Sequence, residues 1–276
     1  MIGKKMNLIW RIIMYSVINK TWLDVVKTLV NQGGESSPRG MKIKEVLHCQ
    51  TCVDMHNPVL SIKSRKLGYK FMPAEAAWIL SGDDRVKTIE PYSKSIARFS
   101  DDGKKFFGAY GTKIREQINY VVDKIAKDLD TRQAVINIWR ESPHETNDVP
   151  CTISAQWIVR DNKICCIDTM RSSDIWLGWP YDIFNFSMIS AFIALKLREE
   201  YGIKLDLGWI ALNAGSQHLY ENNWAAARVC LSDNEQFEVE PLDLDEFDGP
   251  YDLLNHLWNV ANRKKPITKK FLKELY

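Results

Sequence analysis

The segment that most constrains the fold of this chain is an apolar run from Ile183 to Glu200. Its hydrophobic residues fall nearly all round a helix instead of along one stripe, and a helix of that kind is buried. The most apolar part, Ile183 to Leu197, is shorter than the roughly 20 residues that a membrane-spanning helix needs. We therefore expect a buried central helix in an α+β domain, built around a largely antiparallel or mixed sheet.

The composition is typical of a soluble globular protein, with 45% hydrophobic and 26% charged residues among 276. A net charge of +2 does not indicate the dense basic face of a duplex-binding protein, so we expect no nucleic-acid partner. The N-terminal run is interrupted by Arg11 and has no small-residue cleavage site, which argues against a signal peptide. We expect a cytoplasmic protein, in the host cytoplasm if it is viral, with no membrane partner.

Periodicity and turn residues predict the other elements. The predicted helices cover Thr21–Gln32, Pro73–Gly82, Ile114–Leu129 and a segment from about Asn222. The predicted strands cover Met41–Met55, Thr131–Trp139, Ser154–Val159, Lys163–Met170 and Leu205–Leu212. Asp161-Asn162 suits a hairpin turn, and the lysine-rich tail from Arg263 is expected at the surface. No linker or repeat divides the chain, so we expect one catalytic domain over 21–276 after an extension over 1–20.

Six cysteines in a chain of this size do not indicate a disulfide framework. Cys49 and Cys52 have metal or redox spacing, but they form a single pair inside a strand-like run. Buried free thiols are the better interpretation. We expect no bound metal.

Cys151 is the candidate nucleophile. A cysteine attacks only as its thiolate, which needs nearby positive charge, and Arg39, Arg132 and Arg171 can supply it. No Cys-His dyad is evident, because Thr152 follows the cysteine and His144 lies in a polar loop. On its own a Pro-Cys pair is more often structural, and that alternative stays open.

Three further signals lie downstream of Cys151. Arg171-Ser-Ser-Asp174 brings a guanidinium, hydroxyls and a carboxylate to a strand end, which suits a phosphate or a surface ion pair. Asp182 follows a Gly-Trp-Pro-Tyr turn, where it could simply cap the apolar helix. His218 and Tyr220 would point the same way in an extended segment, to hold one hydroxyl or to pack.

Taken together and in order, these motifs resemble the thymidylate synthase family, which includes the pyrimidine-nucleotide hydroxymethylases. The resemblance runs from roughly Thr21 to Trp224, and its most specific residues are Pro150-Cys151, Gln156, Arg171-Ser172-x-Asp174, Leu177-Gly178-x-Pro180 and His218-x-Tyr220. It implies a three-layer α+β fold with the sheet at the interface of a homodimer. It also implies 5,10-methylenetetrahydrofolate as one-carbon donor and an active site that borrows an arginine from the partner.

The resemblance assigns the nucleotide contacts by position. Arg39, Arg171 and Ser172 look like phosphate ligands of the same subunit, and Arg132 resembles the phosphate arginine given by the partner. His218 and Tyr220 look like the contacts to the ribose 3′-hydroxyl, and Gln156 also falls among the substrate-binding residues.

The same resemblance assigns the chemistry. Cys151 looks like the nucleophile that adds to pyrimidine C6, and Glu75 looks like the glutamate that orders water and relays protons. Tyr110 resembles the active-site tyrosine, and Asp174 the carboxylate that holds the folate pterin.

Asp182 departs from the family in an informative way, because the thymidylate-forming members carry asparagine there. Uracil presents an N3–H donor and an O4 acceptor, which one amide satisfies. Cytosine presents an N3 acceptor and an N4 amino donor, which a protonated carboxyl satisfies. A mismatched, desolvated contact costs about 1–3 kcal/mol. Asp182 therefore predicts a cytidylate substrate.

Three other departures bear on the reaction. Thr152 stands where the synthases usually have histidine, and Gln133 where many members have a second arginine. No tryptophan occurs between Trp78 and Trp139, although the synthases keep one there against the folate. A loop without that ring is consistent with admitting water, which a hydroxymethylase needs.

The sequence thus predicts hydroxymethylation at C5 of a cytidine monophosphate, dCMP in first place, with release of tetrahydrofolate. The nearest alternatives are a thymidylate synthase and a dUMP hydroxymethylase. A non-catalytic member that binds nucleotide or RNA is the alternative of another class. A modified cytosine nucleotide suggests a phage that marks its own DNA or a nucleoside-antibiotic pathway.

Overall fold

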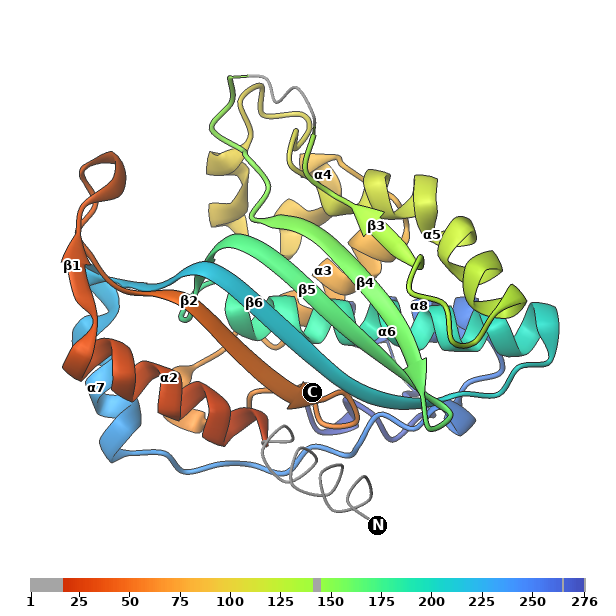
Figure 1. The fold of residues 1–276 in the computed structure, drawn as a ribbon. Coiled ribbons are helices and arrows are strands. Elements are labelled where there is room, and N and C mark those ends of the chain that lie inside the picture. Colours follow the sequence, from red (N-terminus) through yellow and green to blue (C-terminus); the bar gives the residue numbers. More distant parts are fainter. Residues whose placement is uncertain (1–16, 141–144, 265, 276) are drawn as a thin grey trace, which may run out of the picture.

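The fold is organised around one six-stranded sheet (Figure 1). The computed structural model describes residues 17–140, 145–264 and 266–275. The strands lie in the order β1-β2-β6-β5-β4-β3. Their bounds are β1 Gly34–Ser36, β2 Ile43–Asp54, β3 Val135–Asn137, β4 Thr152–Arg160, β5 Lys163–Asp174 and β6 Asp206–Tyr220.

The sheet is mixed, as predicted. β5 and β6 pair in parallel, whereas the other neighbours are antiparallel. The turn between β4 and β5 uses Asp161 and Asn162, whose φ angles of 53° and 59° suit a tight hairpin. The connection from β5 to β6 must cross over because the two strands are parallel, and it contains the apolar helix.

That helix, α6 (Trp179–Tyr201), is buried along most of its length, as the sequence predicted. It packs against β5 and β6 on one side and against α3 (Phe71–Leu80), α5 (Tyr110–Lys127) and α8 (Pro250–Ala261) on the others. It ends at Gly202, whose φ of 66° is the left-handed conformation of many helix C-termini. A helix with neighbours on all sides needs apolar residues on all sides, which explains its sequence.

The helices are unevenly distributed about the sheet (Figure 1). Helices α6, α3, α5 and α8 lie behind it, while α2 (Ile18–Gln32) and α7 (Trp224–Ser232) lie along the edge of β1 and β2. In the part of the chain that the structure describes, no helix covers the front face. Leu47, in the middle of β2, is 69% exposed. No helix among the described residues is long and apolar enough to cross a membrane.

Three predictions about elements need correction. The strand predicted over Thr131–Trp139 is only β3, because the amides of Ile138 and Trp139 both converge on the Ile153 oxygen and end the ladder. The strand predicted over Leu205–Leu212 continues to Tyr220 as β6, since both of its neighbours extend alongside it. The tail beyond Arg263 is not all surface, because Phe271 and Leu272 are fully buried.

The cysteines are all free thiols. Cys49 and Cys52 lie on β2, and burial raises the pKa of Cys52 to about 12. The described residues contain no group of three or more His, Cys, Asp or Glu side chains arranged to hold a metal ion.

Candidate active site

Two neighbouring cavities lie at the end of the sheet where β4 begins and β5 and β6 end. The first, which we call the arginine cavity, has a volume of about 730 Å³. Among its lining residues are Arg39, Glu45, Val149, Arg171, Ser172, Ser216, His218 and Tyr220. The second, which we call the cysteine cavity, has a volume of about 280 Å³. Among its lining residues are Glu75, Trp78, Phe99, Phe106, Tyr110, Val149, Cys151, Gly178, Asp182 and Asn185.

Cys151 lines the cysteine cavity next to Arg171 and Ser172, two residues of the arginine cavity. Its Sγ is 3.9 Å from the Ser172 Oγ and 3.7 Å from a terminal guanidinium nitrogen of Arg171. Burial raises the pKa of the Cys151 thiol, and the Arg171 charge opposes that shift. The ligand-free thiol is therefore held mainly in its protonated form, with one cation already in place to favour the thiolate.

Arg171 also ties the segment before Cys151 to the sheet. Its Nε donates to the Pro150 oxygen at 3.0 Å, and its terminal nitrogens donate to the Val149 oxygen at 3.0 Å and the Ser172 hydroxyl at 3.1 Å. A planar guanidinium with several fixed donors suits this role better than a lysine would. Cys151, the candidate nucleophile, and Arg171 are thus positioned as one unit.

The opposite wall of the arginine cavity comes from β6 and the β1–β2 connection. His218 and Tyr220 point the same way, as the extended segment predicted, with ring centroids 5.1 Å apart. Arg39 has a φ of 55°, an uncommon conformation for a residue with a side chain. Glu45, which the sequence did not single out, lines this wall and accepts hydrogen bonds from Ser36 and Ser216.

Asp182 lines the cysteine cavity from the first turn of α6. It does not cap that helix, because no side-chain capping bond is made there. Among the described residues its carboxyl has no hydrogen-bond partner, and the residue is half-buried. Burial, together with the nearby carboxyls of Asp168, Glu75 and Asp174, raises the pKa of Asp182 well above its ordinary value. These surroundings therefore favour the protonated form of the side chain at the wall of the cavity.

Glu75 faces the same cavity from α3. The Asn185 amide donates to its carboxyl at 2.9 Å, and burial raises the pKa of Glu75 to about 7 against the opposing effect of that bond. A carboxyl with a pKa near neutrality exchanges protons readily at physiological pH. Tyr110, at the start of α5, accepts the backbone N–H of Thr152 at 3.1 Å, beside the cysteine.

Aromatic rings line the cysteine cavity although the loop before Tyr110 contains no tryptophan. Phe99 and Phe106 come from that loop, and Trp78 packs edge-on against Phe106 with centroids 5.6 Å apart. These rings therefore supply an apolar wall for the cavity without a tryptophan from that loop.

Three candidate residues lie outside both cavities. Asp174 ends β5 beside His218, where its carboxyl accepts the Trp176 N–H and keeps one buried oxygen without a partner in the described chain. Gln156 donates to the backbone oxygen of Arg132 at 2.8 Å. Arg132 is exposed just before β3 and lines neither of the two cavities.

Asp168 is a buried carboxyl that sequence reasoning missed. It lies on β5 with no exposed surface, and neither of its oxygens is hydrogen-bonded within the described segments. Burial raises the pKa of Asp168 well above its ordinary value. A single aspartate in an apolar strand can be recognised in the sequence as a buried carboxyl. Nothing in the sequence, however, shows that Asp168 lies near Asp182.

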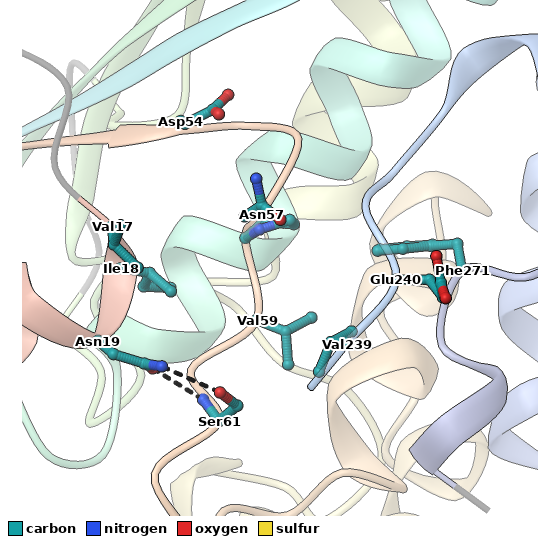
Figure 2. Close-up of a pocket in the computed structure, with 11 residues that line it drawn as sticks. Val17, Ile18, Asn19, Asp54, Asn57, Val59, Ser61, Val239, Glu240 and Phe271 are labelled. Atoms are coloured by element: carbon teal, nitrogen blue, oxygen red, sulfur yellow. Dashed lines mark hydrogen bonds between the residues drawn. The ribbon is translucent and has the colours of Figure 1, made fainter. Parts of the chain in front are cut away.

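A different cavity, of about 380 Å³, lies at the other end of the sheet (Figure 2). It is lined by residues from the start of α2 and the end of β2, and Asn19 and Ser61 are hydrogen-bonded beside it. None of the candidate catalytic or nucleotide-binding residues lines it. The arginine and cysteine cavities therefore hold most of the candidate site residues, and this third cavity holds none.

The profile of the family described as "Thymidylate synthase" matches residues 20–253, most of the chain. The chain belongs to the thymidylate synthase family. It is also similar to the "Deoxyuridylate hydroxymethyltransferase" of Bacillus phage SP01, with 28% identity over 274 aligned residues. That alignment covers 88% of this chain and 69% of the phage protein.

Membership of the thymidylate synthase family gives the general activity. The protein is a one-carbon transferase that acts on a pyrimidine nucleotide, and members of the family use methylenetetrahydrofolate. The mixed sheet with helices stacked behind it is consistent with that family's α+β fold.

Proposed function

We propose that this protein hydroxymethylates C5 of a cytidine monophosphate, dCMP in first place, and releases tetrahydrofolate. The observation that carries this proposal is the carboxyl of Asp182, which lines the cavity of Cys151 without a hydrogen-bond partner among the described residues and whose pKa is raised well above its ordinary value. A neutral carboxyl has one donor and one acceptor. It can donate to N3 of cytosine and accept from the N4 amino group at the same time.

Asp182 also serves the first chemical step. The Cys151 thiolate adds to C6, and the electron pair displaced from the C5–C6 bond needs a sink. Transfer of the Asp182 proton to N3 provides it and leaves a carboxylate facing two N–H groups, which is a strong pairing. Ring nitrogen N3 is a stronger base than a carbonyl oxygen, so the transfer favours cytosine over uracil.

The arginine cavity supports the other half of the nucleotide. Arg39, Arg171 and Ser172 supply charge and a hydroxyl for the phosphate, and His218 and Tyr220 face the place of a ribose hydroxyl. The exposed position of Arg132 and the uncovered front face of the sheet support a homodimer in which Arg132 enters the partner's site.

Asp174, with one buried oxygen unpartnered, is the candidate contact for the folate pterin. Methylenetetrahydrofolate supplies the one-carbon unit when it is bound. A buried acceptor without a donor fits a ligand that carries N–H groups, as a pterin does. No metal has a part in the proposed reaction.

A dUMP hydroxymethylase is the second candidate. A neutral acid can also donate to O4 of uracil and accept from N3–H, so protonation of Asp182 does not exclude uracil. The similarity to the deoxyuridylate hydroxymethyltransferase of the phage favours this alternative. The two candidate functions differ in the base of the substrate. Both reactions pass through a covalent adduct with Cys151, and both give a hydroxymethylated product.

The deciding experiment is incubation of the protein with methylenetetrahydrofolate and dCMP, CMP or dUMP in separate reactions. We expect dCMP to gain a hydroxymethyl group by mass spectrometry, with tetrahydrofolate formed. Hydroxymethylated dUMP alone would establish the second candidate, and methylated dUMP with dihydrofolate would refute both.

The base-reading role of Asp182 has its own test. Asp182→Asn restores the amide that suits uracil, so the ratio of kcat/KM for dCMP over dUMP should fall at least about tenfold, the equivalent of about 1.4 kcal/mol. An unchanged ratio would remove Asp182 from substrate selection.

A further inference from the structure

We propose that Asn185 positions the water whose oxygen becomes the hydroxyl of the product, and that Glu75 takes the proton of that water. Asn185 is a positioning residue here, since it acts through the water. The proposal rests on the hydroxymethylation proposed above.

The geometry places Asn185 on the catalytic face of α6. It lies three residues after Asp182, almost one helical turn, so both side chains face the cysteine cavity. Only 3% of Asn185 is exposed. The polar atoms of such a buried amide must be satisfied by hydrogen-bond partners.

In the ligand-free chain only one of the two polar atoms of the Asn185 amide has a partner among the described residues. The Asn185 Nδ2 donates to a Glu75 oxygen at 2.9 Å, which fixes the orientation of the amide. Its Oδ1 is buried and has no partner within the described residues. An unsatisfied buried carbonyl costs about 1–3 kcal/mol, so a water or ligand donor is favoured there.

A water at this position would have the contacts that the second half of the reaction needs. It can donate one hydrogen to Asn185 Oδ1 and the other to the Glu75 carboxylate, which leaves a lone pair free. Because Cys151 and Asp182 line the same cavity, that lone pair can be directed at the base. With a pKa of about 7, Glu75 is substantially ionised at neutral pH and can accept a proton.

The step balances as follows. After the one-carbon unit has been transferred, the nucleotide carries an exocyclic methylene at C5 and the Cys151 sulfur at C6. The water oxygen forms a bond to the methylene carbon, and one water proton passes to Glu75. The electron pair moves through the ring, restores the C5–C6 double bond and expels the Cys151 thiolate.

The test separates loss of water attack from loss of substrate binding. Asn185→Leu keeps the size of the side chain and removes both polar atoms, and Asn185→Ser is a second, smaller variant. We measure the release of tritium from 5-tritiated dCMP, the hydroxymethyl product, and the product formed when an added small thiol traps the exocyclic methylene. If the wild type accepts only dUMP, 5-tritiated dUMP replaces dCMP.

For both variants we expect hydroxymethyl product to fall by about 100-fold while tritium release changes by less than about threefold. The thiol-trapped product should appear in their place. Ser187→Ala is the matched control. Among the described residues, this buried hydroxyl on α6 bonds only to the Ile183 oxygen of its own helix. Its loss should change neither the yield of hydroxymethyl product nor the tritium release.

A parallel fall of tritium release and hydroxymethyl product, with no thiol-trapped nucleotide, would overturn the role of Asn185 and leave it as a structural support of Glu75. Failure of the proposed function gives a different result, because the wild type itself would then form no hydroxymethyl product from any nucleotide.

Discussion

The contact between Arg171 and Cys151 makes a prediction about thiol reactivity. The guanidinium lowers the pKa of Cys151 against the effect of burial, so Arg171→Ala should raise that pKa further. The rate of alkylation of Cys151 by iodoacetamide at pH 8 should fall by about tenfold, because only the thiolate reacts. Mass spectrometry of the Cys151 peptide distinguishes it from the other five thiols. An unchanged pH profile of alkylation would show that Arg171 serves only the phosphate.

The buried carboxyl of Asp168 predicts that the stability difference between the wild type and an Asp168→Asn variant depends on pH. Its pKa is raised in the folded state, so above the unfolded pKa of about 3.9 the unfolded chain loses the proton first and folding is disfavoured. The penalty grows by about 1.4 kcal/mol per pH unit until the folded pKa is reached. Asp168→Asn should therefore be more stable than the wild type at pH 7, with the gap closing towards pH 4. Urea unfolding at both pH values measures it, and a gap independent of pH would contradict the assignment.

Among single residues, the sequence predicted those that a local hairpin brings together. Cys151, Arg171 and Ser172 fall together because β4 and β5 form a hairpin that pairs their ends, as the turn at Asp161 predicted. Asn185 could not be identified in this way. Its meaning depends on Glu75, 110 positions away on another helix.

The pairing of β5 with β6 depends on a glycine. A Cβ atom at Gly215 would lie 2.8 Å from the backbone oxygen of Arg171, closer than such atoms approach. Gly215→Ala should therefore push the strands apart beside the arginine cavity, with a loss of about 1–3 kcal/mol of stability and a raised KM for the nucleotide. Gly34→Ala, whose Cβ would have no neighbour nearer than 3.9 Å, is the control. Equal melting temperatures and KM values for the two variants would refute this.

Among the elements, α6 was the most predictable and β3 the least. A helix that is apolar on all sides has few places in a fold, and its burial follows from its own residues. The length of an edge strand depends instead on how many of its residues pair with the neighbouring strand. The polar start of the segment at Thr131 gave no sign that only three residues would pair with β4.

On the scale of the whole molecule, the exposed Arg132 predicts shared sites. A Cys151→Ser subunit keeps Arg132, and an Arg132→Ala subunit keeps Cys151. Each homodimer should be nearly inactive, whereas an equal mixture that exchanges subunits should recover about a quarter of wild-type activity, since half of the dimers would hold one intact site. Activity that never exceeds the mean of the two parents would show that Arg132 acts in its own subunit or not at all.

The unpartnered polar atoms around the two cavities have a thermodynamic consequence. Within the described chain, Trp78 Nε1, Asn185 Oδ1 and His218 Nδ1 are buried without hydrogen bonds, and all three residues line a cavity. The empty protein therefore carries a desolvation cost that a fitting ligand removes, so occupancy and melting temperature are linked. A nucleotide at 100 times its Kd adds about 2.7 kcal/mol. A thermal melt across a panel of monophosphates would thus rank cytosine against uracil and deoxyribose against ribose, with neither folate nor turnover required.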